Sequence, residues 1–223
     1  MNYNLSFDYV WDYVGVLSAG LGITLFYTLI SLVLGLALGF VAAVARQYGG
    51  KVSSFVAIFY VEIFRGTPVL VQMFWFMFCV PALLGVQIGA ATSTLLTLTL
   101  YMGAIASESF RSAFRSIGTE QGDASLALSF SPWVFIVYVV LPQALLRAVP
   151  NLLSNSVTLF KESALVSAMG INDLMYVSQS IAEMTGRPVE ILTVAALTYF
   201  VIAFGVTRIV SLIERLLLRR LAM

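Results

Sequence analysis

Long apolar stretches separated by short polar ones dominate this chain. A helix needs about 20 mostly apolar residues to cross the hydrocarbon layer of a membrane. Four stretches meet that length directly: residues 17–45, 54–81, 90–110 and 189–212. A fifth apolar region covers residues 134–168 and is interrupted by Pro142 and Pro150. The pattern predicts an all-α protein that spans a membrane.

The fifth region is too long for one simple span, and splitting it at Pro150 would give two marginal spans. Each proline lacks a backbone donor and is expected to bend or end a helix. We therefore expect residues 134–149 to form a helix against the membrane on the cytoplasmic side, and the true span to cover residues 150–169. Ser131 followed by Pro132 suits the start of the first helix, because Ser can cap it and Pro is tolerated at its first position.

The distribution of basic residues favours five spans with the N-terminus outside and the C-terminus in the cytoplasm. Arg187 is then left outside, beside Asp173, Glu183 and Glu190. A sixth span would move the C-terminal arginines to the outer face, against the positive-inside rule. The basic residues that fall inside with five spans are Arg46, Lys51, Arg111, Arg115, Arg215, Arg219 and Arg220.

Composition narrows the possible functions. Of the 223 residues, 60% are hydrophobic and only 10% are charged, too few for the surface of a soluble domain. The chain has no histidine and one cysteine, Cys79, which excludes a disulfide framework and a conventional Cys–His or Ser–His site. It has no phosphate-binding P-loop motif, so any ATP must be hydrolysed by another chain. The acidic N-terminus predicts no cleavable signal, and the absence of repeats and linkers predicts one domain over residues 1–223.

One polar loop, residues 111–132, interrupts the apolar pattern. Within it, Thr119 can cap a short helix whose first turn holds Glu120 and Asp123, where the helix dipole favours acids. Ala124, Ala127 and Leu128 then share one face. Such a helix could dock on a partner protein or cover its own membrane domain, and the residues alone leave both open.

Three blocks of this chain, in order from Tyr60 to Leu174, resemble the permease subunits of ABC importers for polar amino acids. Asp123-Ala124-Ser125, followed by Leu141-Pro142, is similar to the "EAA" loop of those permeases. The run YVEIFRGTPVLVQMFWF resembles their Arg-Gly-Thr-Pro-Leu-Leu-Val-Gln block, and LPQALLRAVPNLL with LFKESAL resembles their Leu-Pro-Gln-Ala and Lys-Asp-Ser/Thr-Ser-Leu blocks. Asp123 and Ser125 depart from Glu and Ala. Ser129 stands where the family has Gly, which leaves open the geometry of the turn after the helix.

The resemblance implies a type I ABC importer-like transmembrane domain with five transmembrane helices and a cytoplasmic coupling helix, in the bacterial plasma (inner) membrane. It implies alternating access, an ATP-binding subunit dimer, a second permease subunit, identical or related, and a periplasmic or extracellular amino-acid-binding protein. This chain would bind no cofactor, since the partner ATPase uses the ATP and Mg. The residues expected to couple to the ATPase are Glu120, Gln121, Gly122, Asp123, Ala124, Ser125, Ala127, Leu128, Ser129, Leu141 and Pro142.

Polar side chains at membrane depth are the candidates for the substrate path, because a charge there costs about 2.5–3.5 kcal/mol. Glu62 and Arg65 could simply pair on one helix face. Alternatively, the Gly66-Thr67-Pro68 segment breaks the helix and offers backbone groups to a polar solute. Asn155 and Thr158 form a polar patch that contains no acid. This slightly favours a neutral or acidic amino acid as the substrate over a cationic one. The candidates are Arg65, Gly66, Thr67, Pro68, Gln72, Tyr101, Asn155, Thr158, Lys161 and Glu162.

Two other features have structural interpretations. The spacing of Glu108 and Arg111 predicts an ion pair at a helix end, at the inner surface. Gly35 and Gly39 predict close helix packing on the first span. Among competing functions, a stand-alone transporter or exporter would show inverted repeats or an isolated acid. An intramembrane enzyme would need a nucleophile–base pair or metal ligands, and the sequence shows neither.

Overall fold

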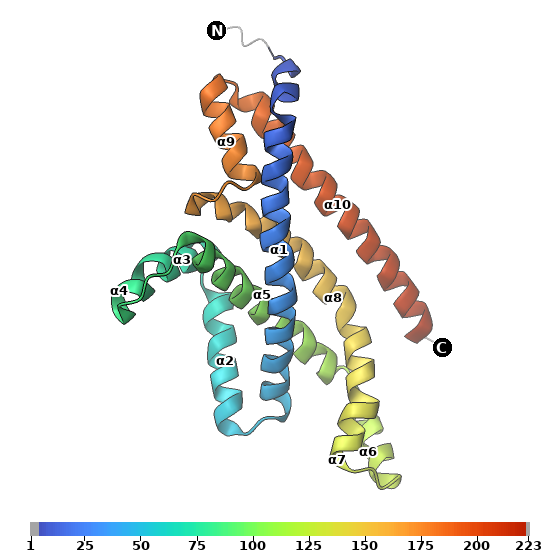
Figure 1. Ribbon diagram of the computed structural model, residues 1–223. Coiled ribbons are helices and arrows are strands. Elements are labelled where there is room, and N and C mark those ends of the chain that lie inside the picture. The colour runs from blue at the N-terminus through green and yellow to red at the C-terminus, as the bar shows by residue number, and fades with distance from the viewer. Residues whose placement is uncertain (1–4, 222–223) are drawn as a thin grey trace. The chain divides into compact units, whose positions relative to one another are not determined.

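The computed structural model describes residues 5–221, and over that range every regular element is a helix (Figure 1). This confirms the all-α expectation. The elements are α1 (Asp8–Tyr48), α2 (Lys51–Gly66), α3 (Val69–Phe74), the π-helix η1 (Trp75–Cys79), α4 (Val80–Leu84), α5 (Ala90–Arg115), α6 (Thr119–Ala127), α7 (Pro132–Val134), the π-helix η2 (Phe135–Val140), α8 (Leu141–Glu162), the 3₁₀ helix η3 (Ser163–Met169), α9 (Leu174–Thr185) and α10 (Pro188–Leu221).

Among the described residues, four helical stretches are long and apolar enough to cross a membrane: Asp8–Tyr48, Ala90–Arg115, Pro132–Met169 and Pro188–Glu214. A fifth span results if the broken pair Lys51–Gly66 and Val69–Leu84 counts as one. The helices therefore accommodate the five spans that the sequence predicts.

The expectation that Pro150 begins a new helix is wrong. Pro150 lies inside α8, and helical structure runs without a gap from Pro132 to Met169. A proline removes one donor, but in an apolar region the remaining backbone groups still gain most by pairing within the helix. The local irregularity lies earlier, because the wide turns of η2 end directly before Leu141 and Pro142.

The chain forms two compact units that interleave along the sequence. The first unit comprises residues 5–33, Thr67–Thr99 and Val157–Val206, and the second comprises Leu34–Gly66, Leu100–Ser156 and residues 207–221. The long helices α1, α5, α8 and α10 each contribute to both units.

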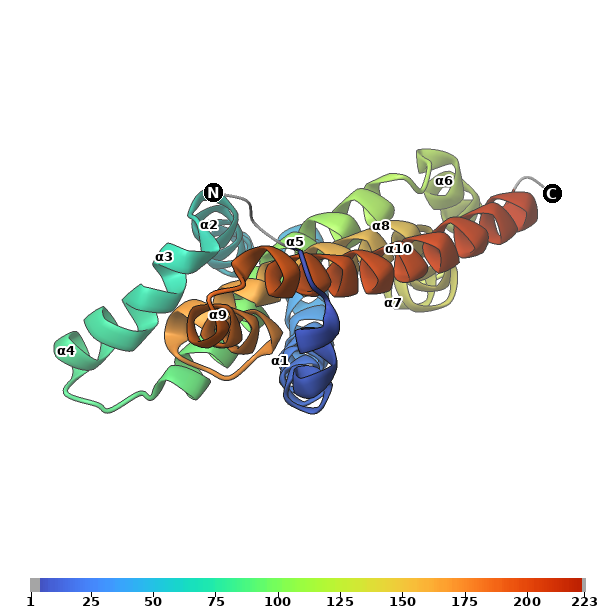
Figure 2. The same ribbon diagram turned by 90° about the horizontal axis from the view of Figure 1, so that it is seen from above.

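In the first unit, α9 lies beside the N-terminal part of α1 (Figures 1 and 2). Gly20 permits this contact, because a Cβ at that position would lie 3.1 Å from the backbone oxygen of Asp173. The Thr24 hydroxyl accepts a hydrogen bond of 3.0 Å from the backbone N–H of Leu174. The buried apolar core of this unit consists of Leu17, Leu174, Val177, Ile181, Ala182 and Ile191.

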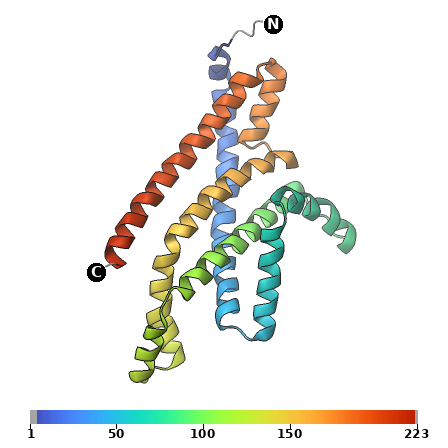
Figure 3. The same ribbon diagram turned by 180° about the vertical axis from the view of Figure 1, so that it is seen from behind.

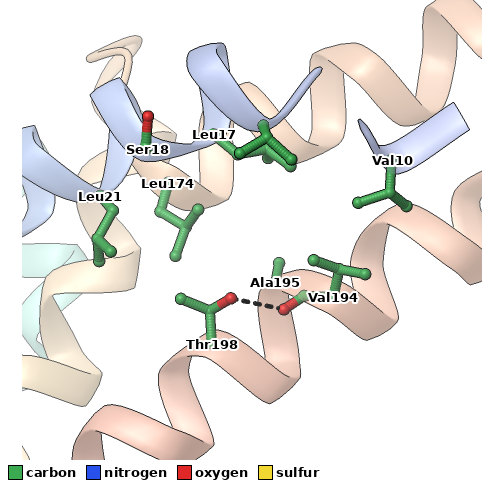
Figure 4. Close-up of a pocket in the computed structure, with 9 residues that line it drawn as sticks. Val10, Leu17, Ser18, Leu21, Leu174, Val194, Ala195 and Thr198 are labelled. Atoms are coloured by element: carbon green, nitrogen blue, oxygen red, sulfur yellow. Dashed lines mark hydrogen bonds between the residues drawn. The ribbon is translucent and has the colours of Figure 1, made fainter. Parts of the chain in front are cut away.

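A cavity of about 200 Å³ lies beside this core, between α1, α10 and Leu174 (Figure 4). Its lining is apolar apart from Ser18 and Thr198, whose hydroxyls donate to backbone oxygens of their own helices at 2.9 and 2.8 Å. A charged solute would lose its hydration there and gain no partner, so this cavity does not suit an amino acid.

In the second unit, the C-terminal half of α1 and α2 form an antiparallel pair that packs on α5 (Figure 3). Gly35 and Gly39 are buried, and a Cβ on either would lie within 2.7 Å of the side chain of Met102 or Ala106 on α5. The Tyr60 hydroxyl donates a hydrogen bond of 2.6 Å to the backbone oxygen of Leu100. The predicted close packing at the two glycines is therefore present.

Candidate coupling helix and path residues

The polar loop contains the expected short helix, α6, in the second unit. Gly118, with an extended backbone, occupies the N-cap position, and not Thr119 as predicted from the sequence. Glu120 lies in the first turn, where an acid is favourable. The helix therefore begins one residue earlier than expected from a cap formed by the Thr119 side chain.

At the end of α6, a serine occupies the left-handed backbone position that usually requires glycine. Ser129 adopts a left-handed conformation with φ of 55°, unlike every other described residue except three glycines. The N–H of Phe130 donates to the oxygen of Ser125 at 3.0 Å, and the N–H of Ser129 donates to the oxygen of Leu126 at 3.0 Å. These two hydrogen bonds form a Schellman motif, which requires the left-handed conformation at Ser129.

The exposed face of this loop is more apolar than the sequence suggested. Ala124, Ala127 and Leu128, which the sequence places on one helix face, are exposed, whereas Ser125 is buried. Leu126 and Trp133, which the sequence analysis missed, have 76% and 72% of their surface exposed. A run of large apolar residues that continues past the capping Ser131 is the signal that could have identified them.

Hydrogen bonds connect the loop to the helices on either side. The Ser131 hydroxyl accepts from the N–H of Val134 at 3.4 Å, which confirms the predicted cap at the start of α7. The Arg147 guanidinium on α8 donates to the backbone oxygen of Ser116, and to its hydroxyl at 3.2 Å. Of the remaining coupling candidates, Gln121 and Asp123 are exposed, as is Pro142, while Gly122 and Leu141 are half-buried.

The predicted helix break at Gly66-Thr67-Pro68 is present, since α2 ends at Gly66 and α3 begins at Val69. Gln72 is buried, and its side-chain amide donates to the backbone oxygen of Thr67 at 2.9 Å and to its hydroxyl at 2.8 Å. This amide fixes the backbone of the break. Thr67 and Pro68 themselves are exposed.

The charged residues beside the break pair differently from the simplest expectation. Arg65 makes its ion pair with Glu108 on α5, at 3.6 Å, and among the described side chains Glu62 forms no ion pair. Glu108 also accepts from Arg111 at 3.0 Å, as predicted, and pairs in addition with Arg46 on α1. Of the three arginines that pair with Glu108, the sequence spacing predicted only Arg111.

The polar residues of α8 have distinct environments. The Asn155 amide donates to the Ser109 hydroxyl of α5 at 2.9 Å. Lys161 is exposed and Glu162 is half-buried, and the described side chains include no ion pair between them, as expected for adjacent residues. Thr158 and Tyr101 are half-buried. That these residues line one path stays a prediction.

The acids of the described chain do not form a metal centre. Over residues 5–221, no group of three or more His, Cys, Asp or Glu side chains lies close enough together to hold a metal ion. The candidate site comprises an exposed helix on a polar loop and polar groups at a helix break.

Comparison with known proteins shows which family the chain belongs to. Residues 35–219 match the family model described as "Binding-protein-dependent transport system inner membrane component". The chain belongs to that family. It is therefore a permease subunit of an ABC-type importer, a multi-pass membrane protein of bacterial type whose ATPase is a separate subunit.

Individual relatives match nearly the whole chain. The glutamine transport system permease protein GlnP of Escherichia coli K12 is 33% identical over 95% of this chain and 98% of its own length. The arginine transport system permease protein ArtQ of Bacillus subtilis is 32% identical over 95% of this chain and 97% of its own.

A solved structure described as an amino acid ABC transporter with histidines has a TM-score of 0.89 and 29% identity, and covers 96% of this chain and 99% of that chain. A methionine ABC transporter, MetNI, at 22% identity and a TM-score of 0.65 over 94% of this chain and 99% of its own, shares the fold. The membership disfavours the stand-alone transporter and the intramembrane enzyme.

Proposed function

We propose that this permease imports polar amino acids, as a dimer with an identical or related permease subunit. The observation that carries the proposal is the match over nearly the whole chain to relatives named for glutamine and arginine transport. An ATP-binding dimer on the cytoplasmic side and a binding protein outside complete the assembly. The five spans keep the predicted orientation, with the N-terminus outside.

Transport proceeds by alternating access. The ATPase drives it through an exposed apolar strip on α6 and α7, which consists of Leu126, Leu128 and Trp133. When the ATPase dimer binds ATP and Mg²⁺ and closes, it carries the docked strip with it. Leu126, Leu128 and Trp133 offer the apolar contact, and Asp123 an exposed charge at its edge. The hydrogen bonds of Arg147 to Ser116 pass the movement to α5 and α8.

The helix break and α8 provide the polar groups that an amino acid needs in the membrane. At the break, Gly66 and Thr67 are exposed, and the Gln72 amide holds the backbone oxygen and the hydroxyl of Thr67. On α8, Asn155, Thr158 and Glu162 follow at spacings of three and four, on one helix face. We propose that these groups, with Pro68, Tyr101 and Lys161, replace part of the hydration of the substrate, while Arg65 is paired with Glu108.

The decisive experiment is ATP hydrolysis by the reconstituted assembly, stimulated by the binding protein with each of a panel of amino acids. Stimulation and uptake with one or a few polar amino acids are expected. Stimulation by none of the panel, with an assembly that hydrolyses ATP, would refute the substrate class. Solute movement by the purified chain alone, without any ATPase, would refute the proposed mechanism.

The coupling assignment has its own test. Asp123→Lys reverses an exposed charge on α6 and is expected to abolish uptake and substrate-stimulated hydrolysis, while the protein still inserts into the membrane. Glu183→Lys makes the same reversal at an exposed position of α9 and is the matched control. Equal uptake by both variants contradicts the docking role of α6.

The orientation can be tested with single cysteines in a Cys79→Ser background. Gln121→Cys on α6 is expected to react with a membrane-impermeant thiol reagent only from the cytoplasmic side, and Glu183→Cys only from outside. Both positions are exposed. Reaction of both from one side contradicts the topology.

A further inference from the structure

Three arginines converge on a single carboxylate in the second unit. Arg46 of α1, Arg65 of α2 and Arg111 of α5 each form an ion pair with Glu108. Among the described side chains no other acid pairs with any of them. The group therefore has a surplus of two positive charges.

The hydrogen-bonding capacity of the group is equally unbalanced. Three guanidinium groups carry about 15 N–H donors, whereas one carboxylate offers about four acceptor positions. The Arg46 side chain is only 10% exposed, so water cannot solvate it fully. A charge removed from water in this way is costly unless a counter-charge and hydrogen bonds compensate it.

The three arginines differ in exposure. Arg46 and Glu108 are the most buried members of the group, at 10% and 18% exposed. Arg111 is 24% exposed and Arg65 is 44% exposed, so these two side chains are the more accessible ones. An anion that reaches the group meets them before the buried, already paired Arg46.

The position of the group along the helices indicates where that anion comes from. Arg46 lies in the last turn of α1, and Arg111 lies one turn before the end of α5, whereas Arg65 pairs with Glu108 from the last turn of α2, the end opposite Lys51. In the proposed orientation these ends of α1 and α5 face the cytoplasmic headgroup layer, so this step rests on the proposed function. That leaflet is rich in anionic lipids, and basic pockets between spans on this side bind their headgroups.

We propose that Arg46, Arg65 and Arg111 around Glu108 form a binding site for the phosphate group of an anionic phospholipid. Arg65 and Arg111 bind the phosphate oxygens with charge-assisted hydrogen bonds. Glu108 holds the three guanidinium groups in place and leaves the surplus charge that selects an anion. The lipid thereby joins α1, α2 and α5.

The test is a lipid titration of the complete permease–ATPase assembly, followed by native mass spectrometry. The probes are phosphatidylglycerol, phosphatidylcholine and inorganic phosphate. We expect phosphatidylglycerol to bind at least about tenfold more tightly than phosphatidylcholine. Both lipids carry the phosphate, but the choline cation of phosphatidylcholine is repelled by the surplus positive charge of the group. Millimolar inorganic phosphate is expected not to displace it, because free phosphate lacks the acyl chains.

Arg111→Gln and Arg65→Gln are each expected to weaken phosphatidylglycerol binding about tenfold. The matched control is Arg115→Gln, which removes the same charge from an exposed position one turn further along α5. Its binding is expected to remain that of the wild type. An unchanged helical circular-dichroism signal of each variant shows that it is folded, and the wild-type selectivity provides a test that needs no variant.

Several results would overturn the proposal. Equal wild-type affinity for the two lipids means that the surplus charge of the group does not select an anionic lipid. Equal loss in Arg115→Gln and Arg111→Gln means that a diffuse surface charge attracts the lipid. Full displacement by phosphate means a general anion site, and selectivity found only without the ATPase subunits means that a partner's carboxylate fills it. An assembly that imports no amino acid yet keeps the selectivity refutes the proposed function and leaves the lipid site standing.

Discussion

The contact between α1 and α5 makes a quantitative prediction at Gly39. A Cβ added there would lie 2.7 Å from the Cβ of Ala106 and 2.7 Å from the backbone oxygen of Gly103. Carbon atoms in contact prefer about 3.5–4.0 Å, so Gly39→Ala forces α1 and α5 apart by several tenths of an ångström or more. Overpacking of this kind costs about 1–3 kcal/mol.

The same helix offers a matched control. Gly22 of α1 is exposed, and a Cβ there would meet nothing within 4 Å. Replacement of Gly by Ala inside a helix gains about 1 kcal/mol of intrinsic helix stability at either position. The gain cancels in the comparison, so Gly39→Ala should be about 1–3 kcal/mol less stable than Gly22→Ala.

The comparison is made by thermal unfolding of the purified chain in detergent, followed by the helical circular-dichroism signal. For a chain of this size, each kcal/mol corresponds to about 2–4 °C. Gly39→Ala should therefore unfold roughly 2–12 °C below Gly22→Ala. A midpoint equal to that of Gly22→Ala, or above it, would show that the two helices are not held in close contact at Gly39.

Three further predictions concern single side chains. Glu108→Gln leaves three arginines without a counter-charge and should lower the free energy of unfolding by about 2–4 kcal/mol, measured by denaturation, while the exposed Glu183→Gln should change it by less than about 0.5 kcal/mol. At Ser129, whose φ is 55°, stability should rank Gly at or above Ser and Ser above Val by about 1 kcal/mol, and a more stable Val variant would contradict the left-handed turn. Burial raises the pKa of the Asp173 carboxyl from 3.8 to about 6, so the folded state binds the proton more tightly than the unfolded state. The thermal midpoint should therefore fall as the pH rises from about 4 to about 6. Asp173→Asn should remove this dependence of the midpoint on pH.

Features determined by neighbouring residues could be predicted from the sequence. The break after Gly66 follows from a glycine and a proline in one short segment, and the Ser131 cap from a serine before a proline. The pair of Glu108 and Arg111 follows from a spacing of three on a helix. Each of these depends on a few consecutive residues, so no knowledge of the packing was needed.

Features determined by distant parts of the chain could not be predicted in this way. Arg46 and Glu108 are 62 residues apart in sequence, and only the packing of α1 on α5 brings them together. The continuity of α8 through Pro150 depends on the free energy that all other backbone groups of the helix gain by pairing in an apolar region. A rule about a single proline does not include the contribution of those other backbone groups.

The turn at Ser129 connects these two kinds of information. The sequence shows a serine where the family has glycine, and from the residue alone the turn could have changed. The backbone instead keeps the left-handed conformation and both Schellman hydrogen bonds. A nine-residue helix has little stability of its own, so its two ends must be fixed if it is to transmit force. Because the turn directs the chain from α6 into α7, it also sets where Leu126 and Trp133 lie relative to each other. The two Schellman hydrogen bonds compensate the strain at Ser129, and the docking of α6 and α7 that we propose depends on that turn.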